Sequence, residues 1–124
     1  TLASRRPEQS EQIANSIDNH PLTIANYAEL SLSNFHLVVN TTPLGMTPNI
    51  DSSPLSSDMT LSKETIVYDL VYNPRETKLV RDARSQGLQA TTGLGILIEQ
   101  AALAFAIWTG CNPPRGVLWK AVEN

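Results

Sequence analysis

The chain has 124 residues, of which 41% are hydrophobic and 17% charged, and its formal net charge is −3. This length and composition are typical of a globular domain with a modest core and argue against a disordered chain. The negative charge, without a basic run, argues against a nucleic-acid-binding surface. The single cysteine, Cys111, allows no disulfide within the chain, and the first residues do not resemble a signal peptide. We therefore predict a cytoplasmic protein.

Short apolar runs alternate along the chain with longer segments of helical spacing. The expected strands are 2–3, 22–25, 35–39, 65–71 and 88–90, and the expected helices are 7–17, 73–86, 93–108 and 113–119, with one further helical turn in 27–32. Segment 41–61 is rich in Ser, Pro and Asp and is expected to be a long loop, which is often functional. Such alternation predicts an α/β fold with a parallel sheet and helices on both faces. Because Leu2 and Ala3 read as the end of a strand, we expect the chain to begin inside one.

Segment 93–108 is apolar on almost all sides, which predicts a buried helix. It is too short for a membrane span and carries Glu99 and Gln100. Positions 93, 96 and 100 share one face of this helix. Glycine at position 93 would let a flat ring approach the backbone. An amide at position 100 inside an apolar helix needs a partner, which either the protein or a ligand supplies.

Ligands of parallel α/β sheets bind outside the carboxyl ends of the strands. Ser4, Arg5 and Arg6 follow the first strand, where arginine suits the 2′-phosphate of NADP and an acid would suit NAD. The alternative is a pair of solvated surface arginines. Thr41 lies in a Pro- and Gly-containing turn whose hydroxyls and amides could meet a cofactor, although an ordinary turn explains the pattern equally well. Tyr72 could donate a hydrogen bond to a carboxylate or could only cover the edge of the core.

Other catalytic patterns are missing from the sequence. No Ser/His/Asp set, no Cys/His cluster with metal-ligand spacing and no glycine-rich phosphate loop is present. His20 and His36 flank short strands without an obvious carboxylate partner, and Cys111 lies in a turn. We therefore predict no catalytic residue and no metal site within these 124 residues.

Three motifs in this order resemble those of shikimate dehydrogenases, and the resemblance spans essentially the whole chain. The motifs are Asn-Thr-Thr-Pro-Leu-Gly-Met at 40–46, Asp-Leu-Val-Tyr-Asn-Pro at 69–74, and Gly-Leu-Gly-Ile-Leu-Ile-Glu-Gln-Ala-Ala at 93–102, followed by Trp-Thr-Gly at 108–110. The resemblance implies a Rossmann-like NADP-binding domain. It also implies the reduction of 3-dehydroshikimate to shikimate by hydride transfer from NADPH, a step of aromatic amino-acid biosynthesis.

The resemblance also implies roles for individual residues. Ser4, Arg5 and Arg6 match a family Asn-Arg-Thr that binds the 2′-phosphate; Arg5 keeps the central guanidinium, whereas Ser4 and Arg6 depart from the pattern. Leu70 and Gly93 match positions that touch the cofactor, Gly93 near the nicotinamide. Ile96 stands where the family commonly has Met. Tyr72 and Gln100 match contacts to the carboxylate and a hydroxyl of the substrate.

In this family a catalytic domain with the proton-handling Lys and Asp, a first strand and a glycine-rich turn come before the matched segment. We therefore expect residues 1–124 to form a partial NADP-binding domain, truncated on its N-terminal side and inactive by itself. Two alternatives remain open: a quinate/shikimate dehydrogenase of relaxed specificity, and a non-catalytic regulatory or binding module of the same fold. An open sheet edge would favour pairing with another chain, so a homodimer is possible.

Overall fold

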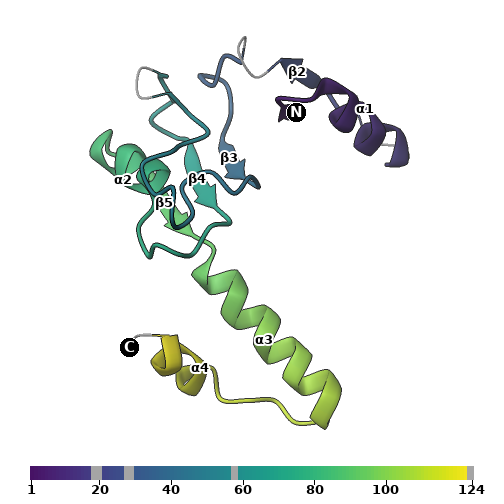
Figure 1. Cartoon of the computed structure of the whole chain (residues 1–124), viewed down its shortest axis with the longest axis vertical. Coiled ribbons are helices and arrows are strands. Elements are labelled where there is room, and N and C mark those ends of the chain that lie inside the picture. Colours follow the sequence, from purple (N-terminus) through teal and green to yellow (C-terminus); the bar gives the residue numbers. More distant parts are fainter. Residues whose placement is uncertain (18–20, 27–29, 57–58, 123–124) are drawn as a thin grey trace. The chain divides into compact units, whose positions relative to one another are not determined.

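The computed structural model of the chain describes residues 1–17, 21–26, 30–56 and 59–122. It divides into two compact units, Thr1–Asn34 and Phe35–Asn124 (Figure 1). Both units are built from parallel strands flanked by helices, which confirms the predicted α/β class.

The first unit is a β-α-β element. Strand β1 (Leu2–Ser4) pairs in parallel with β2 (Ile24–Asn26), and helix α1 (Pro7–Ser16) packs against both strands. Pro7 occupies the first helical turn, where its missing N–H costs nothing. The predicted strand at 22–25 starts two residues later than expected. The helical turn predicted at 27–32 falls partly outside the described residues, and 30–32 are not helical.

The second unit contains a three-stranded parallel sheet. Its strands β3 (Leu37–Asn40), β4 (Ile66–Asp69) and β5 (Gln89–Thr92) lie in that order. The pairing places Asn40 opposite Asp69, and Asp69 opposite Thr92, so all three strands end level with one another. Side chains alternate along β4 and the residues after it: Val67, Asp69 and Val71 are buried, whereas Ile66, Leu70 and Tyr72 are exposed.

Helix α2 (Lys78–Ser85) packs against β4 and β5, and this layer holds the core of the second unit (Figure 1). The core side chains of the layer are Val67, Val71, Leu79, Val80, Ala83 and Leu88. The sequence predicted a helix from about residue 73, and this start is wrong. The helix is capped instead by Thr77, whose hydroxyl accepts a hydrogen bond from the Val80 amide, while residues 73–76 form a bend.

Helix α3 (Leu94–Thr109) and helix α4 (Arg115–Val122) complete the second unit and pack against each other. The prediction that α3 is a buried helix is wrong for the described part of the chain. Only Ile98 and Ala102 are buried in it, whereas Ile107 and Trp108 are 81% and 82% exposed. An all-apolar helix requires cover on every side, and the elements that the structure describes cover only part of it.

Among the described residues, no helix is both long enough and apolar enough to cross a membrane.

Candidate functional site

The carboxyl ends of the three parallel strands of the second unit bring several predicted site residues together. The chain turns out of the sheet immediately after Asn40 and after Asp69. The Leu70 amide donates to the Asn40 carbonyl at 3.0 Å, and the Gly93 amide donates to the Val71 carbonyl at 3.2 Å. Residues 41, 70 and 93 therefore leave the sheet from one edge, which is where ligands of such sheets bind.

Two segments that follow β3 and β4 border an open surface hollow of about 420 Å³. The hollow is lined by Thr41, Thr42, Pro43, Met46, Thr47, Leu70, Val71, Tyr72 and Asn73. Thr41, Leu70 and Tyr72, which the sequence predicted as ligand contacts, are all exposed here. Their hydroxyls and apolar surface are available to a ligand of the size of a nucleotide fragment or a small ring.

A buried carboxylate lies beneath this hollow. The Asp69 side chain is completely buried and accepts three hydrogen bonds, two on Oδ1 and one on Oδ2. Asn40 Nδ2 (2.8 Å) and the Val71 amide (3.0 Å) donate to Oδ1, and Thr77 Oγ1 donates to Oδ2 at 2.6 Å. Buried carboxylates require such donors, because an unpaired one would lose its hydration without compensation.

Asn40 carries this network into the turn that follows β3. Its side-chain oxygen accepts from the Thr42 amide at 2.9 Å and from the Thr42 hydroxyl at 2.7 Å. Its amide nitrogen also donates to the Leu44 carbonyl at 3.3 Å, and the Leu44 amide donates to the Thr42 hydroxyl at 3.2 Å. The turn is therefore held by side chains, as expected where backbone groups leave a sheet.

Asn40, Asp69 and Thr77 were not among the predicted site residues. The signal available in the sequence was a polar residue at the end of a strand that is otherwise apolar, found twice, in 37–40 and in 66–69. Because the carboxyl ends of neighbouring parallel strands lie side by side, two such residues would be expected to meet. Thr77 could be found only once the true start of α2 was known.

Gly93 lies where the chain passes against the backbone of Leu70. A Cβ atom at position 93 would stand 2.2 Å from the Leu70 carbonyl oxygen and 2.7 Å from its carbon. Packing against Leu70 is therefore enough to require glycine at position 93, whether or not a ligand also contacts it. The predicted contact of Gly93 with the nicotinamide ring stays a prediction.

Ile96 and Gln100 lie on helix α3, and both side chains are exposed. The expectation that Gln100 is a buried amide is wrong, so within the described residues it has no desolvation cost to offset. Its predicted contact with a substrate hydroxyl is compatible with this exposure and stays a prediction. Its neighbour Glu99 forms an exposed ion pair with Arg115 of α4, with 3.2 Å between Nη2 and Oε2.

Ser4, Arg5 and Arg6 lie in the first unit, at the carboxyl end of β1. The Ser4 hydroxyl accepts from the Arg6 amide at 3.1 Å, which fixes the turn between β1 and α1. Arg5 and Arg6 are exposed, and neither guanidinium forms a hydrogen bond or an ion pair with any residue that the structure describes. Both donor groups are therefore available to an anion.

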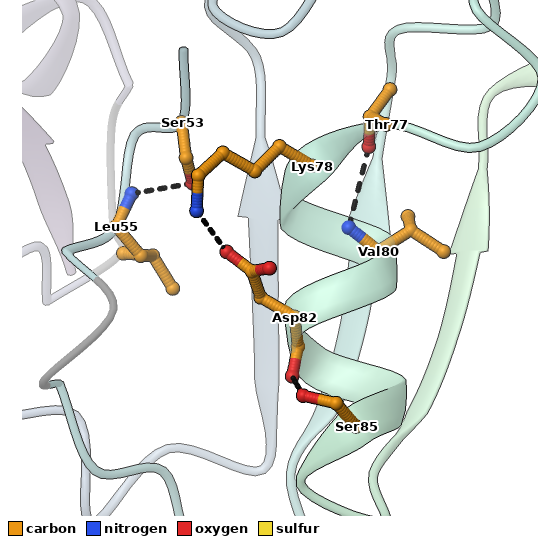
Figure 2. Close-up of polar contacts among 7 residues, drawn as sticks. All are labelled: Ser53, Leu55, Thr77, Lys78, Val80, Asp82 and Ser85. Atoms are coloured by element: carbon orange, nitrogen blue, oxygen red, sulfur yellow. Dashed lines mark hydrogen bonds and ion pairs between the residues drawn. The ribbon is translucent and has the colours of Figure 1, made fainter. Parts of the chain in front are cut away.

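The outer side of α2 forms a different, structural neighbourhood (Figure 2). Lys78 and Asp82 form an ion pair one turn apart, and the Asp82 carbonyl accepts from the Ser85 hydroxyl at 2.7 Å. The adjacent cavity measures about 20 Å³, which is too small for a metabolite, and its lining includes Ser53, Leu55, Met59, Leu79 and Asp82. No group of three or more potential metal ligands occurs among the described residues.

Comparisons with known proteins agree on one family. The model of the shikimate 5′-dehydrogenase C-terminal domain matches residues 93–123. Shikimate dehydrogenase (NADP(+)) of Methanococcus aeolicus is 38% identical to the chain over 126 aligned residues, which cover 98% of this chain and 45% of that protein.

Solved structures show the same similarity. Shikimate 5-dehydrogenase from Thermus thermophilus, in complex with NADP(H) and shikimate, matches with a TM-score of 0.83 and 30% identity, covering 98% of this chain and 44% of that one. Quinate dehydrogenase from Corynebacterium glutamicum, in complex with NAD, also has a TM-score of 0.83, with 27% identity over 94% of this chain and 43% of that one. The chain thus spans a little under half the length of the proteins that it matches.

Proposed function

Since this chain belongs to the shikimate dehydrogenase family and corresponds to its C-terminal part, we propose that it supplies the cofactor-binding part of an NADP-dependent shikimate dehydrogenase. The proposed reaction of the whole enzyme is the reversible reduction of 3-dehydroshikimate to shikimate. The observation that carries the proposal is the hollow at the carboxyl ends of β3 and β4, lined by Thr41, Leu70 and Tyr72.

The residues present fit a phosphorylated dinucleotide. Two exposed guanidiniums, without partners among the described residues, follow β1, where this fold holds the 2′-phosphate of NADP and where an acid would favour NAD. When bound in its reduced form, NADPH, the cofactor would supply the hydride. Arg5 and Arg6 would bind its 2′-phosphate, and Thr41, Leu70, Gly93 and Ile96 would contact the rest of the cofactor.

Substrate binding is proposed for Tyr72 and Gln100. The Tyr72 hydroxyl would donate to the substrate carboxylate, and the Gln100 amide would meet a ring hydroxyl. The chain would thus orient both reactants, while the acid-base groups come from outside these 124 residues. Residues 1–124 alone are proposed to be inactive. The cytoplasmic location and the homodimer remain predictions.

The test is the rate of NADPH formation by the full-length protein with NADP⁺ and shikimate, compared with the rate when quinate replaces shikimate. A shikimate-dependent rate supports the proposal. A higher kcat/KM for quinate would favour the quinate dehydrogenase alternative, which is supported by the similarity to the Corynebacterium glutamicum enzyme. No rate with either compound would instead favour a non-catalytic binding module.

Cofactor choice gives a second, independent readout. Arg5→Ala should raise KM for NADP⁺ about tenfold or more, because a charge-assisted hydrogen bond contributes roughly 1.5–3 kcal/mol. The KM for NAD⁺ should not change. Arg81→Ala removes an exposed cation from α2 and serves as the control. Equal effects of Arg5→Ala on both cofactors would contradict the assignment.

A further inference from the structure

The two segments that line the hollow are joined at both of their ends. At the sheet edge, Asn40 Nδ2 donates to Asp69 Oδ1 at 2.8 Å, and these two residues directly precede segments 41–47 and 70–73. At the far end, the Thr47 amide donates to the Asn73 carbonyl at 3.1 Å, and the Thr47 hydroxyl donates to Asn73 Oδ1 at 3.3 Å. The hollow is therefore bordered by two segments that cannot separate without breaking hydrogen bonds.

The inner of these two connections is buried, and the outer one is exposed. Asn40 and Asp69 are 3% and 0% exposed, so their hydrogen bond is shielded from water, whereas the hydroxyl bond between Thr47 and Asn73 is exposed to it. Hydrogen bonds are stronger in a medium of low dielectric constant, and a buried group left unpaired is costly. The buried connection thus adds to the backbone hydrogen bonds of β3 and β4, which set the register of the two segments where they leave the sheet.

Thr77 extends this connection away from the hollow. It is fully buried and does not line the hollow. Its hydroxyl is connected to the hollow through Asp69, whereas its Cβ and methyl group pack against Gly45 of segment 41–47, 3.6 Å and 4.0 Å from where a Cβ at position 45 would stand. Its hydroxyl donates to Asp69 Oδ2 and accepts from the Val80 amide, so one oxygen joins the carboxylate to the first turn of α2. Valine at position 77 would keep the packing against Gly45 and remove only the hydroxyl, so Thr77→Val tests the part of the connection that passes through the Asp69 carboxylate.

We propose that Thr77, Asp69 and Asn40 are positioning residues of the site: their buried hydrogen-bond chain fixes segments 41–47 and 70–73 relative to each other and to α2. In this way Thr41, Leu70 and Tyr72 are held in the geometry that binds cofactor and substrate. The proposal rests on the proposed function for its kinetic consequence, and on the contacts alone for its structural one.

The experiment compares two substitutions of buried threonines by the isosteric valine in the full-length protein. Thr77→Val removes the bond to Asp69 and the bond accepted from the Val80 amide. Thr65→Val is the control: Thr65 is also buried and directly precedes β4, and its hydroxyl donates to the Phe35 carbonyl at 2.6 Å in a part-buried bond. We expect Thr77→Val to lower kcat/KM for shikimate about tenfold or more, because small misplacements at a reacting site cost up to about 10²-fold. Thr65→Val should leave it within about twofold.

A conservative substitution at position 77 distinguishes an effect on the geometry of the site from an effect on the stability of the fold. Thr77→Ser keeps the hydroxyl and should restore kcat/KM to within about threefold of the wild-type value. Asp69→Asn, which keeps the shape and removes the charge, provides a second variant if Thr77→Val fails to fold. Equal kcat/KM in Thr77→Val and Thr65→Val, at similar thermal stability, would overturn the proposal.

Hydrogen–deuterium exchange tests the same inference without any assay of activity. Thr77→Val should speed amide exchange in 41–47 as well as at the start of α2, whereas Thr65→Val should leave 41–47 unchanged. Acceleration confined to α2 would show that Thr77 is only a helix cap. A wild-type protein that does not act on shikimate would refute the proposed function, and the exchange result would still decide the positioning role.

Discussion

Gly93 shows how one residue can match a functional motif for a structural reason. The sequence singled it out as a place where a flat ring could approach the backbone, yet the backbone that approaches it is that of Leu70, whose carbonyl oxygen would lie 2.2 Å from an added Cβ atom. The sequence did predict that Thr41, Leu70 and Tyr72 lie at the carboxyl ends of strands, where ligands of such sheets bind. The full set of hydrogen-bond donors to the buried Asp69 was not predictable, because an acid at the end of an apolar run does not reveal its donors.

Substitution of glycine by alanine should therefore change the free energy of unfolding in opposite directions at positions 93 and 95 of the same motif. Gly93→Ala should lower the free energy of unfolding by roughly 1–3 kcal/mol, since the backbone of Leu70 must move. Gly95→Ala should raise it by about 0.5–1 kcal/mol, because, apart from its neighbours in helix α3, no described residue has an atom within 4 Å of the new methyl group, and the helix gains propensity. Urea denaturation measures both, and equal effects would contradict the close packing of position 93 against Leu70.

Most elements were predictable because their apolar spacing is local information. The order of strands and helices was confirmed from β1 to α4, with ends displaced by one or a few residues. The start of α2 was misplaced because Pro74 and Glu76 imitate the first turn of a helix, whereas Thr77 caps the helix through contacts with Asp69 and Val80. One of those contacts is distant in sequence and could not be read from it.

The ion pair on α2 is expected to contribute little to the stability of the helix. Lys78 and Asp82 are 28% and 32% exposed, so their pairing is screened by solvent (Figure 2). Asp82→Asn should lower the free energy of unfolding by only about 0.3–0.5 kcal/mol. The difference should vanish at roughly 1 M NaCl, where the screening length falls to about 3 Å. Arg81→Gln, which breaks no ion pair with any described residue, is the control. A larger loss of stability on Asp82→Asn that resists salt would contradict a solvent-screened pair.

At the scale of the molecule, α3 and α4 present more apolar surface than the described residues of the second unit cover. Leu103, Ile107, Trp108 and Val117 are between 58% and 82% exposed. The sequence shows that α3 is apolar on almost all sides, but it did not predict how much of the helix is exposed. Such a helix is stable only when other surfaces cover it, and the sequence pattern does not say which surfaces do so.

This surface should make the 124-residue chain associate in solution. Replacing Ile107 with Ser and Trp108 with Gln should lower self-association measured by sedimentation velocity, because contiguous exposed apolar patches drive association. Ile50→Ser, at a 45% exposed position in the loop after β3, should have little effect. Unchanged association in the double variant would show that the apolar surface of α3 is not responsible.

The alternation along β4 also governs how the chain can change in length. Val67, Asp69 and Val71 face inward and Ile66, Leu70 and Tyr72 face outward, so the core and the hollow share a single strand and its extension. Deleting one residue within 67–71 would invert this alternation on one side of the deletion, so that core side chains there would face water and exposed side chains would face the core. Length variation can therefore accumulate in the connection between segment 41–47 and β4, while the strand itself admits substitutions but no insertions or deletions.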